Sequence, residues 1–229
     1  MARKFFKARK SFKDGPAARK IRSRARSVVR LQAALLLILF VFACDARPEK
    51  KELWAALLIR PALGLFGDSI SAYWPAEELL VPYRPTLIAL PFRTADEIRF
   101  AAESEPGRYT ACLYNGGIND FQGNHSPSAA QLDATTDIQI RTLRVLQTKC
   151  GQILALNIWN VEFPWPVLAA IGLNARMKER VTFVDRLDPE NWIDSSLTED
   201  GLHLNRRGYE FLSEKVLERL RVRDFIYFR

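Results

Sequence analysis

Five short apolar runs constrain the fold of this chain more than any other feature. Each is four to seven residues long and apolar on both faces, and most of them end at Gly, Pro or a polar residue. Such runs are typical of strands in a parallel sheet that helices cover on both sides. The predicted strands are residues 62–66, 86–90, 109–114, 152–158 and 181–184.

Longer amphipathic segments separate or follow these runs. Residues 127–149 and 206–222 place apolar side chains at helical spacing, which predicts two helices. Alternating strands and helices predict a three-layer α/β/α sandwich of flavodoxin-like type, with a parallel five-stranded sheet and right-handed crossovers. In such folds the active site lies at the carboxyl ends of the strands.

The first polar motif is Gly67-Asp68-Ser69-Ile70, directly after the first predicted strand. A serine at a strand-to-helix turn can present its hydroxyl at the sheet edge, with its own N–H directed at a bound oxyanion. The alternative is an ordinary turn in which Asp68 or Ser69 caps a helix.

The second motif, residues 115–120, follows the third predicted strand and reads Asn-Gly-Gly-Ile-Asn-Asp. Its glycines permit unusual backbone angles, and the neutral amide of Asn119 can donate to a developing negative charge. Read alone, the motif is also compatible with a plain Gly/Asn-rich loop.

The third motif, residues 200–205, precedes the last predicted helix. A serine nucleophile needs a base, and a histidine suits that role when an acceptor fixes its ring. His203 and Asp200, three residues apart, meet this requirement. The alternative is that Asp200 caps a helix and His203 is a surface residue.

Taken together, the order and spacing of these motifs resemble those of the SGNH hydrolases, also called GDSL lipases and esterases, over residues 60–222. The resemblance implies that Ser69 is the nucleophile, His203 the general base and acid, and Asp200 its orienting partner. It implies that Asn119 and the Ser69 N–H donate to the oxyanion, and that Gly117 leaves space beside Asn119. It implies no metal or organic cofactor.

The chain departs from the family after the second strand. A glycine usually supplies a third oxyanion donor there, whereas residues 90–94 read Leu-Pro-Phe-Arg-Thr. If Pro91 occupies the position, that donor is absent. The N–H of Phe92 or Arg93 is then the expected replacement, and loss of one donor costs roughly 10²–10³ in rate.

The remaining aromatic side chains and histidines carry weaker expectations. His125, in a polar loop, is expected to be solvated. The aromatic residues after the fourth strand, Trp159, Phe163 and Trp165, form either a substrate wall or a patch over the core.

The cysteines and histidines do not indicate a metal site, because no Cys/His cluster has metal-ligand spacing. Cys112 lies in an apolar run and is expected to be a buried thiol. A Cys112–Cys150 disulfide is the alternative if the chain is exported.

The positive charge of the chain is confined to its beginning. Residues 1–30 hold twelve Lys and Arg and one acid, Asp14, which leaves 22 basic and 25 acidic residues elsewhere. Nucleic-acid binding needs basic residues spread over a folded face, so no nucleic-acid partner is expected.

An apolar run, Leu31–Ala43, follows the basic segment and indicates an export signal. As a helix it spans roughly 20 Å, short of the roughly 30 Å hydrocarbon core. Val41-Phe42-Ala43-Cys44 resembles the lipobox of bacterial lipoproteins, which implies lipidation of Cys44. An uncleaved signal anchor and simple secretion remain alternatives.

These features predict a leader at 1–44, a tether at 45–52 and a hydrolase domain at 53–229. The expected protein is exported and held at the cell envelope, where it cleaves an ester of an acyl lipid or an O-acetylated glycan. Two other functions stay open. One is a non-catalytic envelope binding protein with the same fold. The other is a membrane-anchored protein whose basic leader stays in the cytoplasm and binds a partner or acidic lipid.

Overall fold

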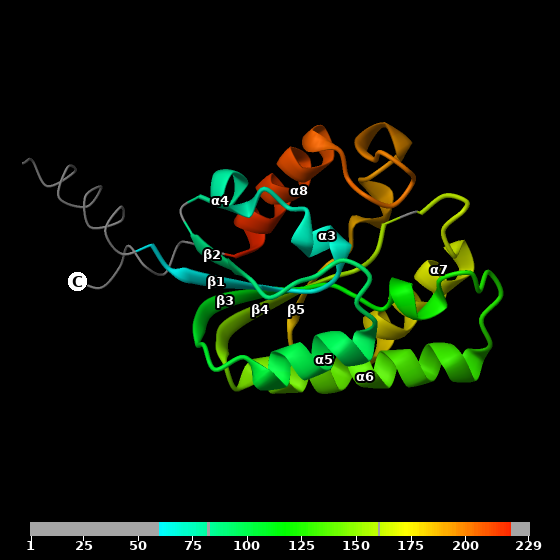
Figure 1. The fold of residues 1–229 in the computed structure, drawn as a ribbon, viewed down its shortest axis with the longest axis horizontal. Coiled ribbons are helices and arrows are strands. Elements are labelled where there is room, and N and C mark those ends of the chain that lie inside the picture. Colours follow the sequence, from blue (N-terminus) through cyan, green and yellow to red (C-terminus); the bar gives the residue numbers. More distant parts are fainter. Residues whose placement is uncertain (1–59, 82, 160, 221–229) are drawn as a thin grey trace, which may run out of the picture. The chain divides into compact units, whose positions relative to one another are not determined.

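The computed structural model describes residues 60–81, 83–159 and 161–220. Its centre is a five-stranded sheet in the order β2-β1-β3-β4-β5, in which every neighbouring pair is parallel (Figure 1). This order is that of flavodoxin-like folds. The structure confirms the predicted fold class.

The strands agree with the predicted runs at the centre of the sheet and differ at its edges. The first and third runs match β1 and β3 residue for residue. The strands are β1 (Ala62–Phe66), β2 (Arg84–Leu87), β3 (Tyr109–Tyr114), β4 (Cys150–Leu156) and β5 (Asp185–Leu187).

Strand β2 overlaps the predicted run 86–90 only at residues 86 and 87, and β5 lies after the predicted run 181–184. Strand β2 begins at Arg84 and includes Pro85, which an edge strand tolerates because its N–H is not needed on the open side. The predicted strand 181–184 is wrong. Val181 is buried as the C-cap of the preceding helix, and β5 starts only at Asp185.

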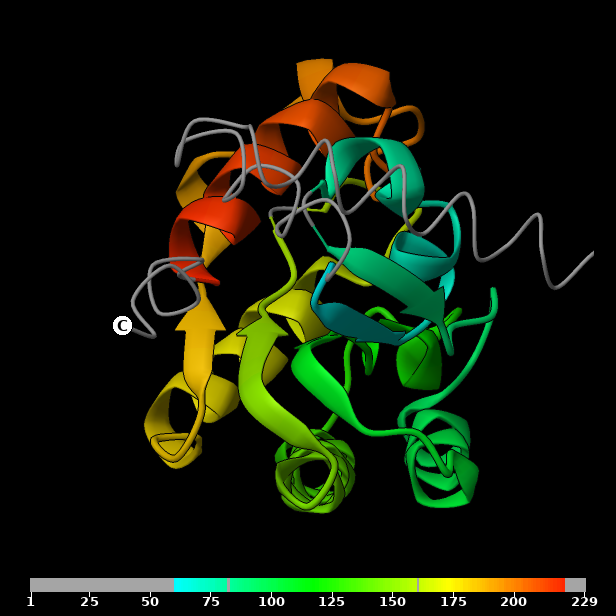
Figure 2. The ribbon, with the colours of Figure 1, turned by 90° about the vertical axis from the view of Figure 1, so that its left-hand side faces the viewer.

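Helices cover both faces of the sheet. Figure 2 shows α5, α6 and α7 on one face and α8 on the other, with α3 and α4 on the α8 side. The helices are α3 (Ser69–Ala72), α4 (Ala76–Leu79), α5 (Ala95–Ser104), α6 (Ala129–Gln147), α7 (Val167–Arg180) and α8 (Arg206–Arg219), with single 3₁₀ turns at η1 (Ile118–Phe121), η2 (Pro189–Asn191) and η3 (Ser195–Leu197).

The strands are buried on both faces because successive side chains point to opposite sides. Leu113 packs in the hydrophobic core that includes α8, whereas Cys112 and Tyr114 pack in the core beneath α5 and α6. Because the strands are apolar on both faces, their side chains fill two hydrophobic cores, one on each side of the sheet. The sequence predicted a sheet covered on both sides.

The predicted helices at 127–149 and 206–222 correspond to α6 and α8. Ser128 and Gln131 form a reciprocal capping box at the start of α6, and the Asn205 side chain caps α8. The sequence did not predict α5 and α7, each of which buries two alanines beside larger residues.

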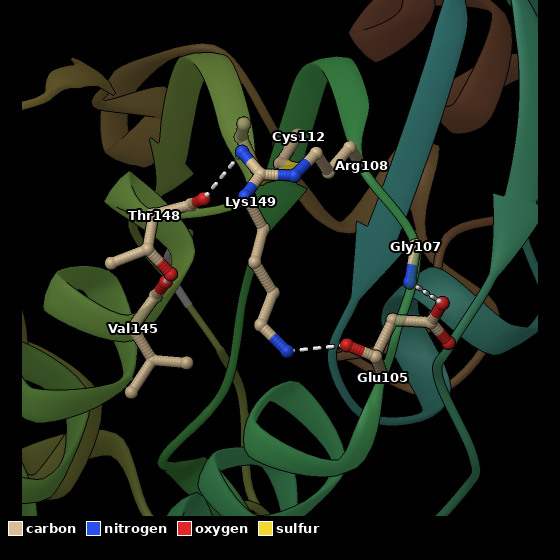
Figure 3. The surroundings of a disulfide bond; sticks show 8 residues. Glu105, Gly107, Arg108, Cys112, Val145, Thr148 and Lys149 are labelled. Atoms are coloured by element: carbon tan, nitrogen blue, oxygen red, sulfur yellow. Dashed lines mark hydrogen bonds between the residues drawn. A yellow bond between two sulfur atoms is a disulfide. The ribbon is translucent and has the colours of Figure 1, made fainter.

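A disulfide joins Cys112 of β3 to Cys150 of β4. The expectation of a buried free thiol at Cys112 is therefore wrong, and the alternative pairing holds. Figure 3 shows polar contacts beside this bond, where Arg108 donates to the Thr148 carbonyl (3.3 Å) and Lys149 donates to the Glu105 carbonyl. These contacts tie together the two connections that precede β3 and β4.

No helix in the described part of the chain is long and apolar enough to cross a membrane. The basic leader, the apolar run, Cys44 and the predicted boundaries at 44/45 and 52/53 all lie outside the described residues. The C-terminal residues after Leu220 lie outside them too.

Candidate active site

Ser69 lies at the carboxyl end of β1, as the first residue of α3. The Asp68 side chain caps this helix by accepting from the N–H of Ile70 (3.0 Å). Because a helix leaves its first N–H groups without internal acceptors, the N–H of Ser69 stays available. Within the described chain it donates to no protein group. Ser69 is 5% exposed, so the residue is almost entirely buried.

The structure brings Ser69, His203 and Asp200 together in one hydrogen-bonded line. The Ser69 Oγ lies 2.8 Å from His203 Nε2, and His203 Nδ1 lies 2.7 Å from Asp200 Oδ2. Ser69 and His203 are 134 residues apart in sequence. The geometry is that of a nucleophile, a base and an orienting carboxylate.

Backbone contacts fix the Asp200 carboxylate. Its Oδ1 accepts from the N–H groups of Leu202 (3.0 Å) and His203 (2.7 Å), leaving Oδ2 for the histidine ring. Partial burial acts to raise the pKa of Asp200. Hydrogen bonds from the His203 ring and these N–H groups outweigh that effect, so the pKa lies below its ordinary value. Asp200 is therefore a carboxylate near neutral pH.

Asn119 lies in η1, after the end of β3 and half-buried. Its Nδ2 donates one hydrogen to the carbonyl of Arg93 (3.0 Å). An amide nitrogen carries two hydrogens, so this bond orients the side chain and leaves the second hydrogen free for a ligand. The contact also joins the second motif to the stretch 90–94, a pairing that the sequence did not predict.

Gly117 adopts φ +99°, a left-handed conformation that glycine tolerates best. A Cβ there would lie 2.1 Å from Gln139 Nε2, which donates to the Gly116 carbonyl (2.7 Å). The space beside Gly117 is therefore filled by Gln139 of α6. Without a side chain, Gly117 lets the start of η1 lie close to α6.

We expect Gly117→Ala to lower the free energy of unfolding by about 2–4 kcal/mol, because it adds backbone strain and displaces Gln139. Gly123→Ala is the matched control. Gly123 has φ +77° but nothing within 4 Å of an added Cβ, so its cost should be only about 1–2 kcal/mol. Urea unfolding of both variants measures the difference. Equal losses would show that the contact with Gln139 contributes nothing.

Residues 90–94, where the SGNH hydrolases usually have a glycine, include a left-handed backbone conformation. Phe92 has φ +66° and is the one non-glycine residue with positive φ in the described chain. Neither its N–H nor that of Arg93 donates to another group of the described protein. Ala95 N–H donates to Asp120 Oδ2 (2.8 Å), which fastens this loop to η1 beside Asn119. The loop thus offers N–H groups near Asn119 despite Pro91.

A buried polar network supports the serine turn, and the sequence reasoning missed its central residue. Asn115 Nδ2 donates to Asp68 Oδ1 (2.6 Å), and Asn115 Oδ1 accepts from the Ser71 hydroxyl. Burial raises the pKa of Asp68, although hydrogen bonds from Ile70 N–H and Asn115 oppose this. The available signal was a polar residue at the end of a buried strand, in a motif already singled out for Asn119.

The aromatic residues after β4 separate into three environments. Trp159 is buried in the core and donates from its indole N–H to the Leu202 carbonyl (2.9 Å). The Trp165 ring lies edge-on to His203, with centroids 5.2 Å apart. Phe163 is exposed, near the exposed His125. Trp165 alone among the three borders the site.

Tyr73 forms a second aromatic contact with the catalytic candidate His203, with ring centroids 5.6 Å apart. Tyr73 follows α3, and Trp165 donates from its indole N–H to the Asp200 carbonyl (2.9 Å). The two rings therefore restrict the His203 side chain. Among the described residues, no group of His, Cys, Asp and Glu side chains is arranged to hold a metal ion.

Comparison with known proteins found solved structures with a similar fold. No family model and no curated protein matches the chain. The structure is similar to that of a GDSL-like lipase from Bacteroides thetaiotaomicron (TM-score 0.58, 15% identity, covering 78% of this chain and 92% of that one). It is also similar to a member of the lipolytic G-D-S-L family from Veillonella parvula (TM-score 0.57, 14% identity, covering 69% and 97%).

The described chain thus has the fold of the GDSL lipases. A hydrogen-bonded serine, histidine and aspartate lie at the carboxyl ends of its strands, where that fold places its sites.

Proposed function

We propose that this protein is a serine ester hydrolase that works through a covalent acyl-enzyme. The single observation that carries the proposal is the line of hydrogen bonds from Ser69 Oγ through His203 to Asp200. A structural role alone would not require a nearly buried serine hydroxyl to face a histidine that is itself oriented by a carboxylate.

In the first half-reaction, Ser69 Oγ attacks the ester carbonyl while His203 Nε2 takes the hydroxyl proton. The carbonyl oxygen becomes an oxyanion, which the Ser69 N–H and the free hydrogen of Asn119 Nδ2 stabilise, with an N–H of Phe92 or Arg93 as the third donor. The tetrahedral intermediate collapses, His203 returns the proton to the departing alkoxide, and an alcohol leaves.

In the second half-reaction, water replaces the alcohol. His203 takes a proton from the water, the resulting hydroxide attacks the acyl carbonyl, and the carboxylic acid is released as Ser69 regains its proton. Asp200 remains ionised throughout and stabilises the imidazolium form of His203. None of these steps uses a metal or organic cofactor.

A fluorophosphonate probe tests this proposal against a binding protein without turnover. We expect full-length protein to be labelled covalently at Ser69, because an activated serine attacks the phosphorus and displaces fluoride. Intact mass and peptide mapping would locate the adduct. The Ser126→Ala variant, which alters an exposed loop serine, serves as the control and should label normally. Absence of labelling in the wild-type chain would favour the non-catalytic binding protein.

We propose further that the hydrolase domain lies outside the cytoplasm, at the cell envelope. The basic segment followed by an apolar run supports this, and so does the Cys112–Cys150 disulfide, since disulfides persist mainly in oxidising compartments. In that location the substrate would be an acyl lipid or an O-acetylated glycan. Cys44 would carry the lipid anchor.

Cys44→Ser is expected to block processing and change membrane fractionation while leaving ester hydrolysis intact, because Cys44 precedes the hydrolase fold in sequence. Mass spectrometry of the native N-terminus checks this, with cleavage before Cys44 and an added lipid mass as the expected result. An intact residue 1 would contradict lipidation. It would favour an uncleaved anchor, including one whose basic leader stays in the cytoplasm.

A further inference from the structure

The left-handed backbone at Phe92 is strained, and burial of the ring does not offset that strain. A left-handed conformation costs a non-glycine residue about 1–3 kcal/mol. A buried ring would recover part of this through packing, but Phe92 is 69% exposed. A glycine would fit the same backbone without strain. The exposed ring at this position is accessible for contact with a ligand.

Phe92 lies at the edge of a groove of about 770 Å³. The β2–α5 loop, residues 88–93, forms one wall of the groove, and a stripe along α5 that includes Phe100 forms the other. Leu90 and Phe100 also line it and are 56% and 66% exposed. Three large apolar side chains thus surround one groove while remaining accessible to a ligand.

One residue that lines the groove contacts the candidate oxyanion donor Asn119. Arg93 lines the groove, and its carbonyl accepts from Asn119 Nδ2 (3.0 Å). From there the groove follows α5 as far as Ser104 and Glu105. A molecule whose carbonyl oxygen is bound near Asn119 could therefore extend along α5.

The positions of His203 and of the groove indicate on which side of the sheet each part of the ester lies. His203 lies shortly before α8 in sequence, whereas residues of α5 line the groove. The two helices cover opposite faces of the sheet (Figure 1). Because His203 returns its proton to the departing alkoxide, the alcohol must lie on the His203 side. The acyl part of the ester then extends from Ser69 toward α5 and into the groove.

We propose that this groove binds the acyl chain of the ester, and that Phe92 and Phe100 determine specificity for chain length. The inference rests on the proposed ester hydrolysis and narrows its substrate class to esters of medium or longer uncharged acyl chains. An uncharged chain is indicated because the groove carries carboxylates at Asp96, Glu97 and Glu105 but a guanidinium only at Arg93. Those charges repel a chain that ends in a carboxylate.

The test compares p-nitrophenyl acetate with p-nitrophenyl octanoate, using full-length protein at constant detergent concentration. We expect kcat/KM for the octanoate to exceed that for the acetate by about tenfold or more in the wild type. Phe92→Gly and Phe100→Ala should each lower this ratio by about three- to tenfold. Both substrates bind the same oxyanion site. A variant that damages only that site therefore lowers both kcat/KM values equally and leaves their ratio unchanged.

Matched variants separate specificity from folding. Phe92→Gly should raise the thermal midpoint, because glycine relieves the strain, even as the ratio falls. Phe92→Tyr and Phe100→Leu should retain the ratio within about twofold, since a large apolar surface remains. Leu168→Ala, which removes an exposed apolar side chain from α7, should leave the ratio unchanged.

A ratio near one in the wild type, or an unchanged ratio in both phenylalanine variants, would overturn the groove assignment while leaving ester hydrolysis in place. An equal loss in Leu168→Ala would do the same, because it would place the chain along α7. Absence of both hydrolysis and fluorophosphonate labelling would instead overturn the proposed function, and this inference with it.

Discussion

Ser69→Ala is expected to abolish ester hydrolysis, lowering kcat by at least about 10⁴-fold. The variant removes the one oxygen that lies within hydrogen-bond distance of His203 Nε2 in the described chain, so no acyl-enzyme can form. The fold should persist, because Ser69 Oγ makes no other hydrogen bond in the described structure and alanine is well tolerated in a helix. Initial rates with an aryl ester and circular dichroism check both statements.

Ser126→Ala provides the matched control for this experiment, since it removes an equally small hydroxyl from an exposed loop. Its rate should equal that of the wild type. Retention of wild-type activity in Ser69→Ala would show that another group is the nucleophile. Loss of the folded circular dichroism signal would assign Ser69 a structural role instead.

His203→Ala is expected to lower kcat by several orders of magnitude, because Ser69 then has no base and the alkoxide has no acid. Asp200→Asn should lower it less, since Asp200 orients the ring but does not take the proton. The chain contains one other histidine, so His125→Ala is a natural control. Its side chain is exposed, and its replacement should leave kcat unchanged.

The pH dependence should identify which group limits activity. A histidine base accepts no proton once it is an imidazolium, so kcat/KM should fall as the solution becomes acidic. The pKa of Asp200 is below its ordinary value, so Asp200 stays ionised over that range. Its contribution is lost only as pH falls through that lowered pKa. Full activity well below pH 5 would therefore contradict His203 as the base.

Local patterns in the sequence were sufficient to predict the central strands and the order of the site motifs. Strands β1 and β3 are apolar at every position that meets a core, and such runs are typical of strands in a parallel sheet covered on both faces. Helix α6 was predicted from its apolar spacing. The Thr94–Glu97 capping box marks the start of α5 and could have revealed that helix, together with the helical spacing of its buried residues Ala95, Ile98 and Ala102.

The identity of the candidate nucleophile, base and carboxylate was also readable, because each lies beside a recognisable element. Ser69 follows a strand, while Asp200 and His203 precede a helix. Parallel strands bring their carboxyl ends to one edge, so polar residues after different strands converge there. The distances between them, however, come only from the folded chain.

Tertiary structure alone decided the features that depend on contacts between distant segments. Among these are the pairing of Cys112 with Cys150, the bond from Asn119 to the Arg93 carbonyl, and the occupation of the space beside Gly117 by Gln139. The left-handed backbone at Phe92 belongs with them, since the local preference of a phenylalanine disfavours it. Sequence periodicity reports how one segment meets a core, whereas these features depend on which segments the sheet order brings together.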